Sequence, residues 1–142
     1  MVNILDMRDI RYINLFSRIT KVQTRYCFIY NDTIIFAVPR NLVSKAIGKE
    51  GTNVRRMNEI LKRKIKIIGN PEEGTQNVGE IKRFIEDIVH PVTFKDIEIT
   101  ETDLILNAGS QSKAALIGRQ RRRESELKEI IKDYFKKDLK IV

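Results

Sequence analysis

The first half of the chain opens with apolar positions at helical spacing and continues with two β-rich runs. An apolar residue recurs every three positions on one face of a helix expected over residues 6–19. Residues 22–30 and 33–38 are rich in β-branched and aromatic residues. The turn-forming pair Asn31-Asp32 separates these runs, which predicts a β-hairpin. The residues expected to face inward from the helix are Ile10, Ile13 and Phe16.

Two helices with a glycine-rich interruption follow the hairpin. We expect Asn41, just after Pro39, to cap a short helix that ends at Ile47. The segment Gly48-Lys49-Glu50-Gly51, called the first loop below, interrupts the helical pattern. Apolar spacings of three and four then predict a helix over about residues 52–63, and a strand follows. The inward positions of this helix and the strand are Val54, Met57, Leu61 and residues 65–68.

The second half repeats this order of elements. A shift of about 70 positions places Ile117-Gly118-Arg119 on Ile47-Gly48-Lys49. We expect Ser110 to cap the short helix that ends at Ile117. The predicted elements are a helix over 76–89 with Val78, Ile81, Ile85 and Ile88 inward and Pro91 beyond it, strands at 92–100 and 103–107, a helix over 121–135 with Leu127, Ile130, Ile131 and Tyr134 inward, and a strand at 139–142.

The pattern therefore predicts an α+β chain in which the order α-β-β-α-α-β occurs twice. Each unit would hold a small three-stranded sheet covered by helices on one face. We expect one domain over residues 1–72 and a second over 73–142, joined through the turn-rich stretch 69–74.

Charge adds a class of partner to this picture. The 142 residues carry a formal net charge of +8 and a pI near 9.7, which favours a polyanion such as nucleic acid. Residues 1–73 hold 14 Lys or Arg against 7 Asp or Glu, whereas residues 74–142 hold 13 against 12. The second half still gathers Arg119, Arg121, Arg122 and Arg123 within five positions, so each half has a basic focus.

Composition argues against several other classes of protein. One cysteine, Cys27, and one histidine, His90, cannot form a disulfide or a four-ligand zinc site, and we read them as structural residues. We expect no metal, cofactor or small-molecule substrate. No apolar stretch approaches the length of a membrane span, and the first residues lack the pattern of an export signal, so we expect a cytoplasmic protein without membrane contact.

The first loop carries the most informative chemistry. Glycine lets the chain turn sharply and leaves room for a ligand, and the helix that begins near Thr52 directs its positive end toward the loop. Lys49 can meet a phosphate, while Glu50 can point to solvent. Ile47 can form an apolar floor for a base. Arg56 lies three positions from Asn53 and either follows an RNA backbone or belongs, with Arg55, to a solvated helix face.

In this setting the sequence resembles the KH domain of type II, which has the same order of elements and a G-x-x-G loop between paired helices. The residues that match are Ala46 to Gly51. The resemblance implies that about four nucleotides of single-stranded RNA are held between the loop and the sheet edge. Two such domains in a short chain resemble the archaeal NusA-like transcription factors. This resemblance implies an RNA-binding factor of transcription termination, antitermination or elongation, with RNA polymerase or its elongation complex as a further partner.

The second loop, Gly118-Arg119-Gln120-Arg121, departs from the G-x-x-G signature because Arg121 replaces the second glycine. We expect a side chain there to hinder close approach of an RNA backbone. Arg119, Arg121 and Arg122 can substitute charge-assisted hydrogen bonds for backbone contacts. The alternative is a solvated basic helix start that binds nothing specific.

No residue set suggests catalysis, since the chain lacks a Ser-His-Asp arrangement, paired metal carboxylates and a nucleotide-binding P-loop. We therefore expect a binding protein and no enzyme. Two alternatives remain: a ribosomal or ribosome-assembly KH protein that binds rRNA, and a protein-interaction module with vestigial RNA binding. The candidate RNA-contacting residues are Ile47, Gly48, Lys49, Glu50, Gly51, Asn53, Arg55 and Arg56 in the first half, and Ile117, Gly118, Arg119, Gln120, Arg121 and Arg122 in the second.

Overall fold

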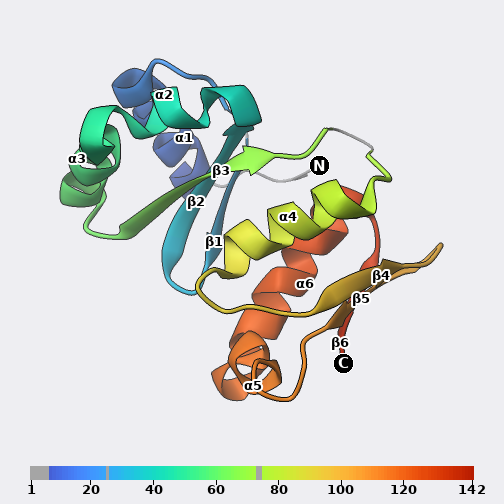
Figure 1. The fold of residues 1–142 in the computed structure, drawn as a ribbon. Helices are drawn as coiled ribbons and strands as arrows, with labels where there is room; N and C mark the ends of the chain where they lie inside the picture. The colour runs from blue at the N-terminus through green and yellow to red at the C-terminus, as the bar shows by residue number, and fades with distance from the viewer. Residues whose placement is uncertain (1–6, 25, 73–74) are drawn as a thin grey trace. The chain divides into compact units, whose positions relative to one another are not determined.

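The computed structural model describes residues 7–24, 26–72 and 75–142. The chain divides into two compact units, Val2–Pro71 and Glu72–Val142, which are called the first and second unit below. Each has its own sheet and its own helices, and the order α-β-β-α-α-β predicted from the sequence is found in both (Figure 1).

The first unit holds a three-stranded sheet in the order β1-β2-β3. Strand β2 pairs antiparallel with β1 and parallel with β3, and the helices contact this sheet (Figure 1). The elements are α1 (Met7–Thr20), β1 (Tyr26–Tyr30), β2 (Thr33–Pro39), a 3-10 turn (Arg40–Leu42), α2 (Val43–Ile47), a second 3-10 turn (Lys49–Gly51), α3 (Thr52–Leu61) and β3 (Lys64–Asn70).

The hairpin between β1 and β2 turns where the sequence predicted. Asn31 and Asp32 have φ angles of 51° and 59°, and Tyr30 pairs directly with Thr33. A two-residue turn with both φ angles positive matches the right-handed twist of its strands, and Asn and Asp tolerate that conformation better than most residues. This turn sets the register that sends Phe36 of β2 toward the core of the unit.

An aromatic pair joins the first helix to the central strand. The rings of Phe16 on α1 and Phe36 on β2 are stacked, with centroids 4.4 Å apart and planes inclined by 23°. Both side chains are fully buried, as is Met57 from α3. Cys27 is buried in the same cluster, which agrees with its interpretation as a packed strand residue.

The second unit repeats the sheet with the order β4-β5-β6. Strand β5 pairs antiparallel with β4 and parallel with β6. Leu104 and Leu106 alternate toward the core along β5, as expected for a sheet covered on one face. The elements are α4 (Val78–Val89), β4 (Asp96–Ile99), β5 (Asp103–Asn107), α5 (Lys113–Ile117), a 3-10 turn (Arg119–Arg121), α6 (Arg122–Phe135) and β6 (Asp138–Ile141).

Two strands begin later than predicted. Residues 22–24 precede β1 and belong to a turn after α1, in which the Val22 amide donates to Thr20 Oγ1 at 3.1 Å. Residues 92–95 likewise lie outside β4, because the Val92 amide donates to the Val89 carbonyl at 2.9 Å and turns the chain at the end of α4. In both places β-rich composition continued through a segment that begins with local hydrogen bonds, and only its last residues, Thr24 and Lys95, bond to the next strand, at the carbonyls of Ala37 and Asn107.

Both predicted helix caps are wrong. Asn41 lies inside a 3-10 turn, and the cap position of α2 is Leu42. Ser110 precedes the first residue of α5 by three positions, and Ser112 holds the cap position without a side-chain hydrogen bond. The sequence missed the cap that does form, in which Asn77 Oδ1 accepts from the Glu80 amide at 3.0 Å at the start of α4.

Two positions predicted to face the core are exposed. Ile10 and Val78 are 42% and 46% exposed. Ile10 lies before Leu15 and Phe16, the buried apolar residues described in α1, and Val78 is the first residue of α4, whose buried residues begin at Ile81. The predicted start of the first helix at residue 6, and residues 73–74 of the predicted linker, lie outside the described residues.

The Phe16–Phe36 stack provides a test of this core. We expect Phe16→Ala to lower the free energy of unfolding by about 3–5 kcal/mol, because it removes a fully buried ring and leaves a cavity. Urea denaturation followed by circular dichroism measures this loss. The control Ile60→Ala changes a side chain that is 51% exposed and should cost less than about 1 kcal/mol. Equal losses for both variants would contradict the assignment of the core.

Candidate nucleic-acid interface

The first loop turns the chain between α2 and α3 through three residues with positive φ. Gly48 has φ 83° and ψ 167°, Glu50 has φ 55°, and Gly51 has φ 75°. The Gly48 amide donates to the Ser44 carbonyl and the Gly51 amide donates to the Gly48 carbonyl, both at 3.1 Å. The loop is therefore a hydrogen-bonded turn that closes one helix and opens the next.

Asn53 explains why the first position of the loop is glycine. Its Nδ2 atom donates to the Ala46 carbonyl at 3.1 Å, so a side chain from α3 ties the loop to α2. A Cβ atom on Gly48 would lie 2.9 Å from that same Nδ2 atom, closer than real Cβ contacts allow. Asn53, which the sequence analysis proposed as an RNA contact, thus has a clear structural role.

The charged side chains of the first loop lie at its surface. Lys49 and Glu50 are both exposed, as are Arg55 and Arg56 on α3. The Arg55 guanidinium donates to the Glu50 carbonyl and so folds back against the loop. Ile47 is half-buried and packs against the core, as a floor beneath the loop requires.

The second loop has the same backbone as the first. Gly118 has φ 75° and ψ 173°, Gln120 has φ 55°, and Arg121 has φ 59°. The same two hydrogen bonds close it: the Gly118 amide donates to the Ala114 carbonyl at 2.9 Å, and the Arg121 amide donates to the Gly118 carbonyl at 3.1 Å. Loss of the second glycine has therefore not changed the turn.

Space at the second glycine position explains why an arginine can stand there. A Cβ atom on Gly51 would meet only Arg55 Nη1, at an ordinary contact distance of 3.5 Å. A larger residue at this position would not clash. It would have to adopt a left-handed φ, which costs a residue other than glycine about 1–2 kcal/mol. Arg121 adopts this left-handed conformation, with φ 59°.

Arg123 does in the second loop what Asn53 does in the first. Arg123 Nη1 donates to the Ala115 carbonyl at 3.2 Å, which ties α6 to α5. A Cβ atom on Gly118 would lie 2.8 Å from Arg123 Cγ, so this glycine is also covered by a side chain. One of the four clustered arginines is thus a half-buried structural residue.

Arg121 is also engaged, in this case by an acid. Arg121 Nη1 lies 3.0 Å from Glu124 Oε1, and the Glu124 side chain is only 10% exposed. Arg119, Gln120 and Arg122 are exposed around the same turn. Within the predicted arginine focus, Arg121 and Arg123 are thus held by Glu124 and by the Ala115 carbonyl.

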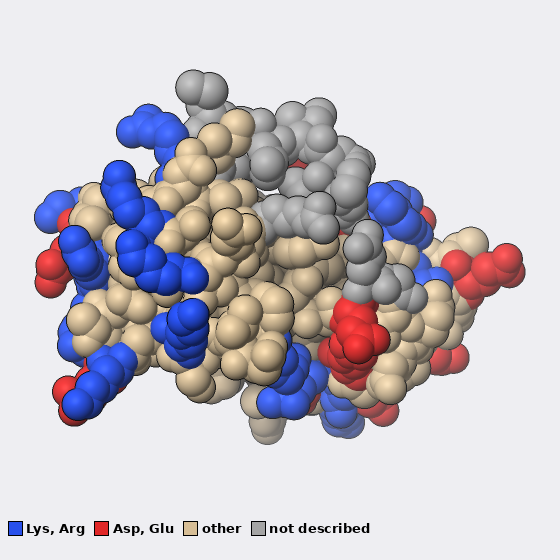
Figure 2. Space-filling model, turned by 90° about the horizontal axis from the view of Figure 1, so that it is seen from above, with Lys and Arg blue, Asp and Glu red and all other residues tan. Residues whose placement is uncertain are grey.

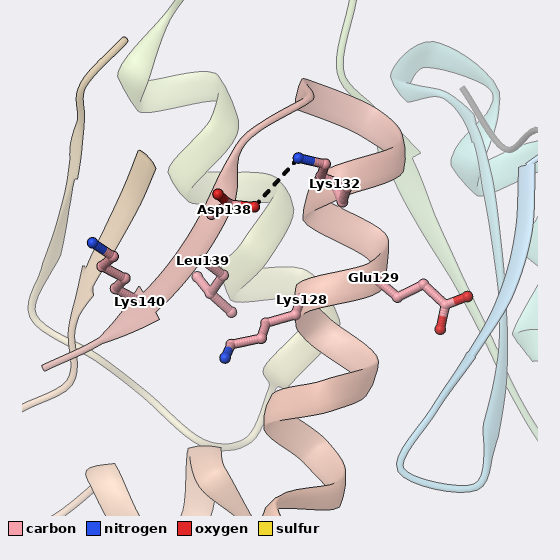
Figure 3. A pocket seen from close by; sticks show the side chains of 6 residues that line it. All are labelled: Lys128, Glu129, Lys132, Asp138, Leu139 and Lys140. Atoms are coloured by element: carbon pink, nitrogen blue, oxygen red, sulfur yellow. Dashed lines mark hydrogen bonds and ion pairs between the residues drawn. The ribbon is translucent and has the colours of Figure 1, made fainter. Parts of the chain in front are cut away.

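A groove between α6 and the edge strand β6 lies in the second unit, and the sequence analysis did not predict it (Figure 3). Its volume is about 490 Å³. Figure 3 shows the Lys132 ammonium facing Asp138, at 3.3 Å, on one side of the groove. Lys128 and Lys132, four positions apart, were the signal available in the sequence. The lining residues are Lys128, Glu129, Lys132, Asp138, Leu139 and Lys140.

The surface charge of the first unit agrees with its sequence balance. On the face drawn in Figure 2, Lys and Arg side chains gather over the part of the surface that the first unit forms. Among the described residues, no group of three His, Cys, Asp or Glu side chains could hold a metal ion. None of the described helices is long and apolar enough to cross a membrane.

Comparison with known proteins relates the first loop to a family of KH domains. Residues 15–74, which include the first loop, match the family model of the NusA-like second KH domain. The probable transcription termination protein NusA of Methanococcus vannielii is 28% identical over 104 residues, which cover 72% of this chain and 56% of that protein. The protein of the same description from Halococcus morrhuae is 25% identical over 92 residues, which cover 65% and 61%. The matched region is thus less than two thirds of either relative.

A solved structure extends the likeness of fold to both units. The crystal structure of APE1850 has a TM-score of 0.68 at 20% sequence identity and covers 97% of this chain and 100% of its own. The element order and strand order found twice are those expected of type II KH domains. The chain is therefore similar to archaeal NusA-like proteins, and both of its units have the element order and strand order of a type II KH domain.

Proposed function

We propose that this protein binds single-stranded RNA through its two loops and acts on nascent RNA as a factor of transcription termination, antitermination or elongation. The observation that carries the proposal is the recurrence of one loop backbone, between paired helices, in both units. The KH domains would span residues 1–72 and 73–142. The names of the two relatives support a role in transcription, with RNA polymerase or its elongation complex as a partner.

The first loop is the stronger phosphate site in this proposal. Helix α3 begins at Thr52 and has no acidic residue in its first turn, so its positive end is not neutralised there. Lys49 is exposed beside that helix end, and Gly51 adds no side chain to the turn, where its nearest neighbour is the flexible Arg55 guanidinium. An RNA phosphate at this turn would meet the helix end and an ammonium group together.

In the second unit, RNA would continue from the loop along α6 toward the sheet edge. Helix α6 begins next to the second loop, and Lys128 lies six residues further on, about 9 Å along the helix. The groove is lined by three lysines and two acids over the largely buried Leu139, so its border carries a small excess of positive charge. Such a surface suits the bases and phosphates of a single strand, and the chain is proposed to act by binding and not by catalysis.

A double substitution in the first loop tests the proposal. We expect Lys49→Asp with Glu50→Asp to reduce affinity for single-stranded RNA at least tenfold, because it replaces the ammonium at the helix end with a carboxylate. Fluorescence anisotropy with a labelled RNA measures the affinity. The matched control, Glu59→Asp with Lys62→Asp, makes the same changes at the far end of α3 and should alter affinity less. Unchanged affinity in a folded loop variant would refute the proposal.

The two glycines of the first loop should differ in their tolerance of a side chain. We expect Gly48→Ala to weaken RNA binding and lower the thermal midpoint, because the new Cβ would displace Asn53 and release its bond to α2. Gly51→Ala should keep the fold at a cost of about 1–2 kcal/mol, since only the left-handed φ is strained. Thermal unfolding and anisotropy compare the variants. A milder effect at Gly48 than at Gly51 would contradict the role assigned to Asn53.

The groove lysines should contribute to the salt dependence of binding. Replacing both Lys128 and Lys132 with Ala should flatten the slope of log K against log salt by about 0.7 for each RNA phosphate that these lysines neutralise. Arg83→Ala, on α4, removes an exposed charge from the same unit and should leave the slope unaltered. Titrations at several salt concentrations supply the slopes, and an unchanged slope in the lysine variant would place the RNA elsewhere.

A further inference from the structure

The two loops share a backbone but differ in most of their side chains, and two of these differences are coupled. Gly51 of the first unit corresponds to Arg121 in the second, and Val54 corresponds to Glu124. In the structure the two replacement residues meet each other, with Arg121 Nη1 3.0 Å from Glu124 Oε1. The second unit has therefore gained a cation and the acid that binds it, one turn apart on the same helix.

The two side chains of this ion pair differ greatly in their exposure to solvent. The Arg121 side chain is 72% exposed and could reach an RNA strand, whereas the Glu124 side chain is 10% exposed. A phosphate that took Arg121 would leave a nearly buried carboxylate without this cation. Breaking such a pair is strongly disfavoured, because the carboxylate has already lost most of its water.

Glu124 also acts on the helix end itself. It lies in the first turn of α6, where its negative charge neutralises the positive end of the helix, whereas α3 has no acid in the corresponding turn. Residues 48–56 and 118–126 each contain two more basic than acidic residues. The two loop regions therefore have the same net charge. They differ in that the second has an acid, Glu124, in the first turn of its following helix.

We propose that Glu124 is a built-in competitor of RNA phosphate. It holds Arg121 and neutralises the start of α6, and so keeps the second loop a weaker phosphate site than its arginines suggest. This inference rests on the proposed RNA binding. It assigns the difference in strength between the two loops to one buried carboxylate.

The test uses the full chain with the first loop disabled by Lys49→Asp and Glu50→Asp. In this background we expect Glu124→Gln to raise affinity for single-stranded RNA by about three- to tenfold and to steepen the salt slope by about 0.7. Adding Arg121→Ala should cancel the added salt dependence and most of the gain in affinity, leaving only the smaller gain from the helix end that Glu124 no longer neutralises, whereas Arg121→Ala with Glu124 present should change little. The control Glu86→Gln removes an exposed acid from the same unit and should leave affinity unchanged.

Glu124→Val provides a second variant if the glutamine variant does not fold, because valine occupies the corresponding position of α3. If Glu124→Gln and Glu86→Gln raise RNA affinity equally, the gain is a general effect of removing negative charge, and the inference is wrong. A gain that Arg121→Ala does not diminish would overturn the role given to this ion pair. If the unmodified chain binds RNA but Glu124→Gln gives no gain, the inference fails alone. If the unmodified chain binds no RNA, the proposed function fails with it.

Discussion

The shape of each loop depends on a side chain that reaches back over a glycine to the preceding helix. Asn53 covers Gly48 and holds the Ala46 carbonyl, and Arg123 covers Gly118 and holds the Ala115 carbonyl. A Cβ atom on either glycine would collide with the covering side chain, and the hydrogen bond ties the second helix of each pair to the first. The exposed middle of the loop can then vary, as Lys49-Glu50 and Arg119-Gln120 do, without changing the turn.

This division of roles explains which parts of the site could be predicted from the sequence. The glycines, the helix pair and the hairpin at Asn31-Asp32 follow from local rules, because each depends on the φ angles or on the spacing of nearby residues. The partners of Asn53, Arg121 and Arg123 could not be inferred in this way. A side chain predicted to meet RNA and one that holds a neighbouring carbonyl have the same chemistry, and only the folded arrangement distinguishes them.

The errors in the fold have a related cause. Asn41 and Ser110 are residue types that favour helix caps, but short 3-10 and turn segments already occupy the chain before α2 and α5. Ile10 and Val78 follow the helical period correctly, yet they lie before the buried apolar residues described in each helix. The apolar period shows which face of a helix is directed toward the core. It does not show how many turns of that face the sheet covers.

A duplicated binding unit can change its strength without losing its fold when substitutions occur in compensating pairs. An arginine alone at position 121 would add a cation beside a positive helix end, and a glutamate alone at position 124 would bury an acid without a partner. Together they satisfy each other at 3.0 Å and leave the loop backbone as it is in the first unit. The second loop is therefore a complete turn whose charge is already balanced, and the first is the same turn with its helix end still open to a phosphate.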